Sequence, residues 1–409
     1  MAAQTRKGDA SGRGNSDGYK VSFPARMYAY NDEEIAAVVN VMKNSECQTQ
    51  GENMARFESD FKTYTGANHA FAVDNATNAL RIAATLCRFK QGDEVIIPAY
   101  TFCATALPFA AEGAKIVWVD MDDTWNADPD DIEKKITKRT KALVVVHLLG
   151  MPCEMEKIMK IARERNLIVV EDCAQAPGAR IGDRHVGTFG DFGCFSFHGA
   201  KNMTTLGEGS MLTVRDDDMA KLVPGVRHNG VRGYEGERER YWVPAMSLVD
   251  FDIDGVWPHN FSMGEAQCAL GSALLKRLDN INGILHEQGM KLRAMFEDTP
   301  EITYNRIPEG FFHIHHQCIY HFEGANGKNR DDLLDITTTK YGIRNIVQYY
   351  PLYRYPIFKK AGFGEADCPK LEKWWDNSFS FPWWCGVPDE TLSYMADSIK
   401  AAIEEFKKA

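Results

Sequence analysis

The apolar positions of this chain follow two alternating patterns. Between residues 70 and 214, short runs rich in β-branched residues alternate with longer stretches in which apolar residues recur every three or four positions. The short runs are typical of buried strands and the long ones of helices, so their alternation indicates βαβ units in a mostly parallel sheet. We expect strands at residues 70–73, 94–97, 115–119, 142–147, 168–170, 193–197 and 210–214. We expect helices at residues 78–87, 104–112, 129–136 and 154–165, the third of them starting at Asp128 and Pro129.

The pattern changes past residue 263. Two long helical stretches, 264–278 and 281–297, precede mixed segments, and a terminal amphipathic helix is expected over 391–408. We therefore divide the chain into a disordered tail (1–20), a large α/β domain (21–278) and a smaller C-terminal α+β domain (279–409). The tail is rich in Gly, Ser, Asp and Arg and lacks the apolar segment of a secretory signal.

Composition narrows the possible partners and the compartment. The 409 residues, 44% of them hydrophobic, can bury a large core. A net charge of −10 gives no basic field for nucleic acid or an acidic membrane, and no apolar run approaches the ~18 residues of a membrane span. Ten cysteines without a C-x-x-C pair indicate free thiols in a reducing cytoplasm.

Polar side chains follow three of the expected strands. Asp172 and Gln175 follow one, Ser196 and Lys201 another, and Thr77 a third. Ligands of α/β sheets bind outside the carboxyl ends of the strands, so these residues are candidates for one site.

Their chemistry matches the needs of pyridoxal 5′-phosphate (PLP). Lys201 offers an amine for a Schiff base, Asp172 a carboxylate for the pyridine nitrogen, and Gln175 a donor for the ring's phenolic oxygen. Taken singly, Asp172 reads as a helix cap and Gln175 as a surface amide, and the joint occurrence with Lys201 is what favours a cofactor site.

A phosphate site and a stacking residue complete the set. A helix starting near Ala76 and Thr77 presents free N–H groups to a phosphate, and Ser196 adds a hydroxyl. Phe102 can stack on the ring face, although a core aromatic is the default interpretation of such a residue.

The chain also resembles the DegT/DnrJ/EryC1/StrS sugar aminotransferases, from about residue 29 to the C-terminus. The matching segments are residues 49–51, 75–80, 98–102, 171–175, 190–193, 195–201, 205–209 and 260–271. The resemblance implies fold type I of the PLP-dependent transferases, with a mixed, mostly parallel sheet covered by helices in the large domain.

The resemblance also implies roles for individual residues. Lys201 would be the Schiff-base lysine, Asp172 the pyridinium partner and Gln175 the phenolate partner. The remaining contacts would be Ala76, Thr77 and Ser196 at the phosphate and Phe102 on the ring. A homodimer with composite sites is implied as well, in which Asn260 reaches the phosphate of the neighbouring subunit's cofactor. A dehydratase branch of the family carries histidine in place of the lysine, so Lys201 favours transamination.

The substrate is less defined by the sequence. The implied reaction moves an amino group from an amino acid, L-glutamate, to a keto group on a nucleotide-linked deoxysugar. Ser262 stands where many members carry Arg or Lys, and Ser210 stands in place of a second glycine after Gly209. Losing a cation at 262 keeps open a free cyclitol or aminocyclitol ketone as acceptor, with glutamine or glutamate as donor. A non-catalytic PLP-binding regulator is the rival from another class.

Other polar clusters carry weaker signals. The cluster of His313, His315 and His316 has no acidic or cysteine partner nearby in sequence, so we expect no metal site and interpret these histidines as cleft-lining or packing residues. The glycine runs do not form a dinucleotide fingerprint, which disfavours a nicotinamide dehydrogenase. Arg227 and the polar residues after it are either solvated or contacts for an anionic group, and we favour the solvated interpretation. The aromatic-rich stretch 379–384 is interpreted as an unusual surface.

Overall fold

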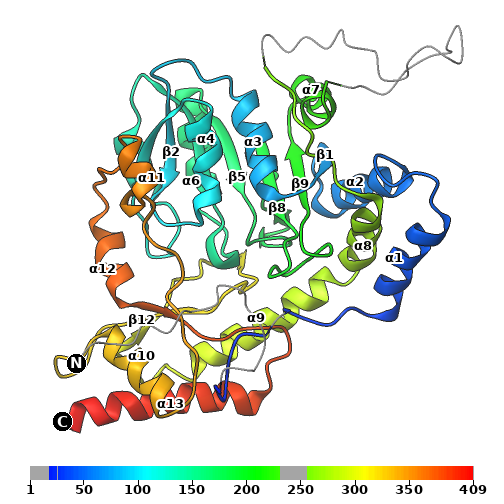
Figure 1. The fold of residues 1–409 in the computed structure, drawn as a ribbon. Helices are drawn as coiled ribbons and strands as arrows, with labels where there is room; N and C mark the ends of the chain where they lie inside the picture. Colours follow the sequence, from blue (N-terminus) through cyan, green and yellow to red (C-terminus); the bar gives the residue numbers. More distant parts are fainter. Residues whose placement is uncertain (1–17, 25, 231–255, 409) are drawn as a thin grey trace, which may run out of the picture.

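The computed structural model describes residues 18–24, 26–230 and 256–408. The tail predicted for residues 1–20 therefore lies outside the described residues as far as residue 17. The centre of the molecule is a seven-stranded sheet in the order β1-β9-β8-β5-β4-β2-β3 (Figure 1). Its strands are β1 His69–Val73, β2 Glu94–Pro98, β3 Lys115–Val119, β4 Thr140–Val146, β5 Ile168–Asp172, β8 Phe192–Ser196 and β9 Ser210–Val214.

This sheet is mostly parallel, as the sequence predicted. The pairings β2–β3, β2–β4, β4–β5 and β5–β8 are parallel. Strand β9 runs against both of its neighbours, β8 and β1. Consequently β8 and β9 form an antiparallel pair at the place where the chain between them carries Lys201.

Both faces of the sheet are buried, because successive side chains of a strand point to opposite faces. In β4, Val144 and Val146 pack into one core, whereas Leu143 and Val145 pack into the other. The helices that follow the strands along the chain are α3 Ala76–Leu86, α4 Leu107–Ala111, α5 Pro129–Lys135, α6 Met155–Arg165 and α7 Asp217–Arg227.

Two helix starts show how local sequence sets these bounds. The side chain of Asp128 accepts a hydrogen bond from Asp130 N and Pro129 opens α5, which confirms the predicted start. The predicted helix 104–112 is instead a 3₁₀ turn, Cys103–Thr105, followed by the short α4. Pro108 lies in the first turn of α4 and has no N–H to donate, so it begins a new helix more readily than it continues one.

The C-terminal part forms a second layer below the sheet in Figure 1. A small antiparallel sheet, β10-β12-β13, lies beside the long C-terminal helix α13 and its neighbours α9 and α10. The segment 352–374 returns to the core of the large sheet, where Leu352, Phe358 and Trp374 are buried. The predicted division at residue 278 stays a prediction.

The elements after residue 263 are α8 Glu265–Leu275, α9 Leu278–Ala294, β10 Ile302–Thr303, β11 Phe311–Phe312, β12 Ile319–Phe322, α10 Arg330–Thr339, η3 Leu352–Arg354, α11 Pro356–Lys360, α12 Pro369–Asn377, β13 Ser378–Ser380 and α13 Asp389–Lys408.

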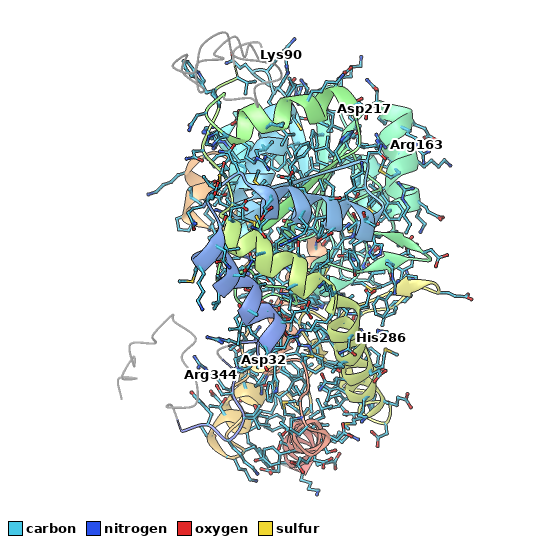
Figure 2. The ribbon with its side chains drawn as sticks, turned by 90° about the vertical axis from the view of Figure 1, so that its right-hand side faces the viewer. Asp32, Lys90, Arg163, Asp217, His286 and Arg344 are labelled. Carbon is cyan, nitrogen blue, oxygen red and sulfur yellow. The ribbon has the colours of Figure 1, made fainter. Side chains whose placement is uncertain are left out.

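Two N-terminal helices, α1 Asp32–Asn44 and α2 Glu52–Thr65, lie against α8 on the outside of the molecule (Figure 2). Helix α1 begins with a reciprocal capping box between Asn31 and Glu34. The chain before it crosses to the C-terminal part, where Val21 pairs with Ile343. Two further pieces, β6 Arg180–Ile181 and β7 Arg184–His185, form a small sheet with β11.

Candidate active site

Lys201 lies in the connection between β8 and β9. The two arms of this connection are hydrogen-bonded to each other, from Phe197 N to Gly209 O at 2.8 Å and from Gly199 N to Gly207 O at 3.0 Å. The N–H of Lys201 donates to His198 O at 2.9 Å. The lysine is thus held on a closed hairpin and not on a free loop.

Asp172 ends strand β5 and is buried. One carboxylate oxygen accepts from Thr105 Oγ1 at 2.8 Å and the other from Ala174 N at 3.0 Å. Thr101 supports Thr105 through a hydroxyl–hydroxyl contact of 2.9 Å. The carboxylate is therefore fixed in direction, which a single ring nitrogen needs in its partner.

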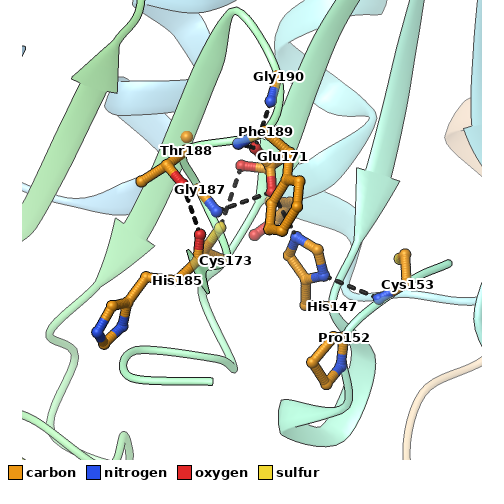
Figure 3. Close-up of polar contacts among 12 residues, drawn as sticks. His147, Pro152, Cys153, Glu171, Cys173, His185, Gly187, Thr188, Phe189 and Gly190 are labelled. Carbon is orange, nitrogen blue, oxygen red and sulfur yellow. Dashed lines mark hydrogen bonds and ion pairs between the residues drawn. The ribbon is translucent and has the colours of Figure 1, made fainter. Parts of the chain in front are cut away.

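Glu171, the preceding residue, points to the opposite face of the sheet, because successive side chains of a strand alternate. Figure 3 shows its polar contacts, which are structural. Its carboxylate accepts the N–H groups of Gly187, Phe189 and Gly190 at 2.6 to 2.7 Å. His147 Nε2 lies 2.9 Å from the same carboxylate. The strand end is thus tied to the loop that leads into β8.

This cluster also has metal-like geometry, because the ligand atoms of His147, Glu171 and Cys173 lie within 4.8 Å of one another. The lone pairs of His147 and Glu171 are already used, however. His147 Nδ1 accepts from Cys153 N at 3.0 Å, and both oxygens of Glu171 accept backbone N–H groups. We therefore interpret the cluster as a structural hydrogen-bond network and not as a metal site.

Helix α3 starts beside these strand ends. Asn75 caps it, with its side chain accepting from Asn78 N at 3.0 Å. Asn78 in turn donates to Asp74 at 2.9 Å. The N–H groups of Ala76 and Thr77 lie in the first turn, where a helix has no acceptor for them, so they are available to an anion.

Gln175 is held at both ends of its amide. Its Oε1 accepts from Leu149 N at 2.8 Å, and its Nε2 donates to Tyr349 OH at 3.0 Å. The second hydrogen of that amide nitrogen remains for another acceptor. Tyr349 also lies 6.1 Å from the ring of Phe102, measured between ring centroids, and has a left-handed backbone with φ of 52°.

One cavity of about 660 Å³ brings the predicted residues together. Lys201, Asp172, Gln175, Phe102 and Ser196 line it, as do Ala76 and Thr77 at the start of α3. Asn260 does not line it; its backbone pairs with His228 and its side chain is exposed. The sequence prediction placed Asn260 at a neighbouring subunit's site, and that role stays a prediction.

The cavity also contains four residues from irregular segments of the C-terminal part, His316, Gln317, Gln348 and Tyr349. His316 belongs to the histidine cluster that the sequence indicated as cleft-lining or packing, whereas sequence reasoning missed the other three. His316 is buried, and its Nδ1 donates to Asn202 Oδ1 at 2.9 Å. Burial and the positive charge of Lys201 lower the pKa of His316 well below its usual value, so the ring is neutral and its Nε2 is an acceptor.

Burial shifts the two central groups in opposite directions. It lowers the pKa of Lys201 to about 8, against the pull of Asp172. It raises the pKa of Asp172, while the hydrogen bonds from Ala174 and Thr105 and the charge of Lys201 oppose the rise. A cationic ring nitrogen beside Asp172 would add a further stabilising charge to its ionised form. The residues therefore fit PLP: a reactive amine, a fixed carboxylate and a helix start for the phosphate.

Two sequence interpretations outside the cavity were wrong. Arg227 is not solvated: it is 6% exposed, and its guanidinium donates to Glu58 at 2.5 Å and to Ala72 O at 2.8 Å. The stretch 379–384 is not a surface, because Phe379, Phe381 and Trp383 are core residues. The imidazole rings of His313 and His315 stack at 3.8 Å and are buried, which corresponds to the packing interpretation.

Comparison with known proteins gives a consistent assignment. The model of the DegT/DnrJ/EryC1/StrS aminotransferase family matches residues 29–400. The chain is 36% identical to the GDP-perosamine synthase of Escherichia coli O157:H7, over 92% of this chain and 97% of that protein. It is 38% identical to the GDP-perosamine synthase of Caulobacter vibrioides, over 64% of this chain and 67% of that protein.

Among solved structures, Helicobacter pylori PseC, an aminotransferase involved in the biosynthesis of pseudoaminic acid, superposes with a TM-score of 0.84. The two chains are 25% identical, and the match covers 94% of this chain and all of that one. The predicted fold class is confirmed. Within the described residues, no helix has the length and apolar character needed to cross a membrane.

Proposed function

Because the chain belongs to the DegT/DnrJ/EryC1/StrS aminotransferase family, we propose that it moves an amino group from L-glutamate to a keto group on a nucleotide-linked deoxysugar. The observation that carries this proposal is the meeting of Lys201, Asp172 and the start of α3 in one cavity. The nucleotide-linked acceptor is supported by two relatives whose names carry GDP. The cofactor of the family is PLP.

PLP, when bound, supplies an aldehyde that takes up the amino group and a ring that withdraws electrons from the substrate carbon. The amine of Lys201 would hold the cofactor and would move the proton between the substrate carbon and the cofactor carbon. Asp172 would accept the N–H of the ring nitrogen and keep the proton there. With a pKa of about 8, Lys201 exchanges its proton readily near neutral pH.

The remaining residues bind and orient. The amide of Gln175 is held between Leu149 and Tyr349, and its free hydrogen would bind the phenolic oxygen of the ring. The first N–H groups of α3, at Ala76 and Thr77, would hold the phosphate with Ser196. Phe102 would cover one face of the ring.

We also propose a homodimer in which each subunit's Asn260 completes the phosphate site of the other. The exposed side chain of Asn260, outside its own subunit's cavity, supports this arrangement. A cytoplasmic location is part of the same proposal, since all ten cysteines are free thiols and several are buried.

Mixing the PLP-loaded protein with L-glutamate tests the proposed reaction. We expect the visible absorption band of the lysine-bound cofactor to bleach and 2-oxoglutarate to appear in equal amount. A visible band that no amino donor bleaches would favour the non-catalytic regulator. After bleaching by L-glutamate, the visible band should return when the acceptor is added. A band that a free cyclitol ketone restores and no nucleotide-linked keto sugar restores would favour the cyclitol acceptor that Ser262 leaves open.

The capture of PLP by the apoprotein should depend on pH through Lys201. Only the neutral amine attacks the aldehyde, and a pKa of about 8 leaves about one molecule in ten neutral at pH 7. We expect the rate of capture to rise with pH and to level off above about 8, as followed by the growth of the visible band. Butylamine in place of the protein controls for the cofactor's own ionisations, and its rate should keep rising to higher pH. A protein rate that followed the butylamine curve would contradict the lowered pKa.

A further inference from the structure

His316 joins the C-terminal part to the connection that carries Lys201. It is buried and lines the cavity together with Lys201. Its backbone is fixed to the turn after β4, because His316 N donates to Leu149 O at 2.9 Å. Its ring nitrogen Nδ1 lies 2.9 Å from Oδ1 of Asn202, the residue that follows Lys201. One nitrogen of the imidazole is therefore used within the protein, and Nε2 is left for the cavity.

Two backbone carbonyls decide which ring nitrogen carries the proton. A carbonyl oxygen only accepts, so the amide nitrogen of Asn282 must face Pro177 O, at 2.8 Å. The amide oxygen of Asn282 then faces Asn202 Nδ2 at 3.0 Å, and Ile314 O lies 3.5 Å from the same nitrogen. Asn202 is thereby oriented with its oxygen toward His316, which must donate from Nδ1.

The lone pair of the neutral ring consequently lies on Nε2. Burial, and after it the charge of Lys201, hold the pKa of His316 well below its usual value, so the ring does not carry a second proton near neutral pH. Within the described residues nothing donates a hydrogen bond to Nε2. A buried acceptor without a donor is costly, so a donor that enters this part of the cavity gains a hydrogen bond there.

The amine of Lys201 is the donor best suited to this acceptor. Lys201 is the only lysine or arginine among the described residues that line the cavity. Its other partner, Asp172, already accepts from Thr105 and Ala174, and in the proposed reaction it would also hold the ring nitrogen of the cofactor. Hydrogen bonds from a charged donor are about twice as strong as those between neutral groups.

We propose that Nε2 of His316 holds the amine of Lys201 whenever that amine is not bonded to the cofactor, and that Asn202 is the positioning residue that keeps Nε2 free of a proton. This rests on the proposed function, because it assigns a role within the transamination site. The acceptor gives the free amine a defined place and stabilises its protonated form. In the opposite tautomer an N–H would point toward the ammonium group and repel it.

The pH dependence of PLP capture by the apoprotein measures this contact. The titratable groups that line the cavity are Asp172, His198, Lys201, Glu208, His316 and Tyr349. Burial lowers the pKa of Lys201 to about 8, and a hydrogen bond to Nε2 opposes that fall because it stabilises the ammonium form. Loss of the acceptor should therefore lower the pKa further. A site that is merely loosened would admit water and raise the pKa instead.

The test compares His316→Asn and His316→Gln with the wild type, since both changes replace a neutral ring with a neutral amide. Asparagine keeps a donor for Asn202 but has no acceptor at the position of Nε2, whereas glutamine reaches that position with its amide oxygen. We expect the midpoint of the capture curve to fall by about one pH unit in His316→Asn and to stay near the wild-type value in His316→Gln. Asn202→Leu should lower the midpoint by a smaller amount, because its ring can carry the proton on either nitrogen.

His69→Asn is the matched control. His69 begins β1, pairs with Asp217 and does not line the cavity, so this variant should give the wild-type curve. Circular dichroism checks that each variant is folded. A midpoint in His316→Asn that is unchanged or higher would overturn the proposal. A wild-type apoprotein that captures no PLP at any pH would instead count against the proposed function itself.

Nitrogen-15 NMR of the histidine rings in the wild-type apoprotein gives a second measurement that needs no turnover. The signals of His316 are assigned as those that His316→Gln lacks among the eleven histidines. We expect a proton on Nδ1 and none on Nε2 at pH 7, and a mixture of the two tautomers in Asn202→Leu. A proton on Nε2 in the wild type would contradict the role of Asn202.

Discussion

Replacing Lys201 with alanine is expected to abolish transamination, by at least about a thousandfold in kcat, because one residue both attaches the cofactor and moves the proton. The visible band should be absent, and borohydride treatment should leave no adduct on the protein. Pyridoxamine phosphate should still bind, since Asp172 and the start of α3 remain. Spectra, adduct mass and equilibrium binding measure the three effects.

Lys221→Ala is the control for this loss. Lys221 lies on α7 and its ion pair with Asp218 is exposed, so the variant should keep the band, the adduct and the rate. Wild-type turnover in Lys201→Ala would remove Lys201 from the chemistry. If Lys201→Ala also loses helical signal in circular dichroism, the same measurements are made on Lys201→Arg. That variant keeps the charge and approximate size of the side chain but forms no such bond, so a folded Lys201→Arg without adduct or turnover would assign the loss to the chemistry.

Replacing Asp172 with asparagine should reduce kcat roughly a hundredfold or more, because a neutral amide no longer holds a proton on the ring nitrogen. The fold should persist, since the new carbonyl oxygen can accept from Ala174 N and the hydroxyl of Thr105 can turn to accept from the new amide. Single-turnover bleaching by L-glutamate measures the loss directly.

Asp191→Asn is the matched control. Asp191 precedes β8 at the far end of the same strands, where it accepts from Val169 N and pairs with Arg215. Removing its charge should change stability slightly and leave the bleaching rate near that of the wild type. A rate in Asp172→Asn that equalled the rate in Asp191→Asn would exclude Asp172 from the site.

The part of the site that lies on the large sheet was predictable from sequence. Its strands are buried on both faces and therefore appear as continuous β-branched runs, after which Asp172, Lys201 and Ala76 follow within a few residues. The carboxyl ends of parallel strands meet at one edge, so a one-dimensional pattern was enough to bring these residues together.

The other wall of the site was not predictable in the same way. His316, Gln348 and Tyr349 come from segments without a periodic pattern, and their positions depend on how the C-terminal part packs on the sheet. The burial of Arg227 could not be predicted from the local sequence either. A charged residue at a helix end is usually solvated, and the burial of Arg227 depends on two groups distant in sequence, Glu58 of α2 and the carbonyl of Ala72.

The closed connection between β8 and β9 has a consequence for repeated turnover. In the proposed reaction, Lys201 would release its bond to the cofactor in each cycle and later form it again. The backbone hydrogen bonds of Phe197 and Gly199 hold the connection that carries Lys201, so we expect the side chain to move while its backbone stays in place. The returning amine then behaves as a tethered reactant, for which effective molarities of about 10⁵–10⁸ M are known when the geometry is well aligned.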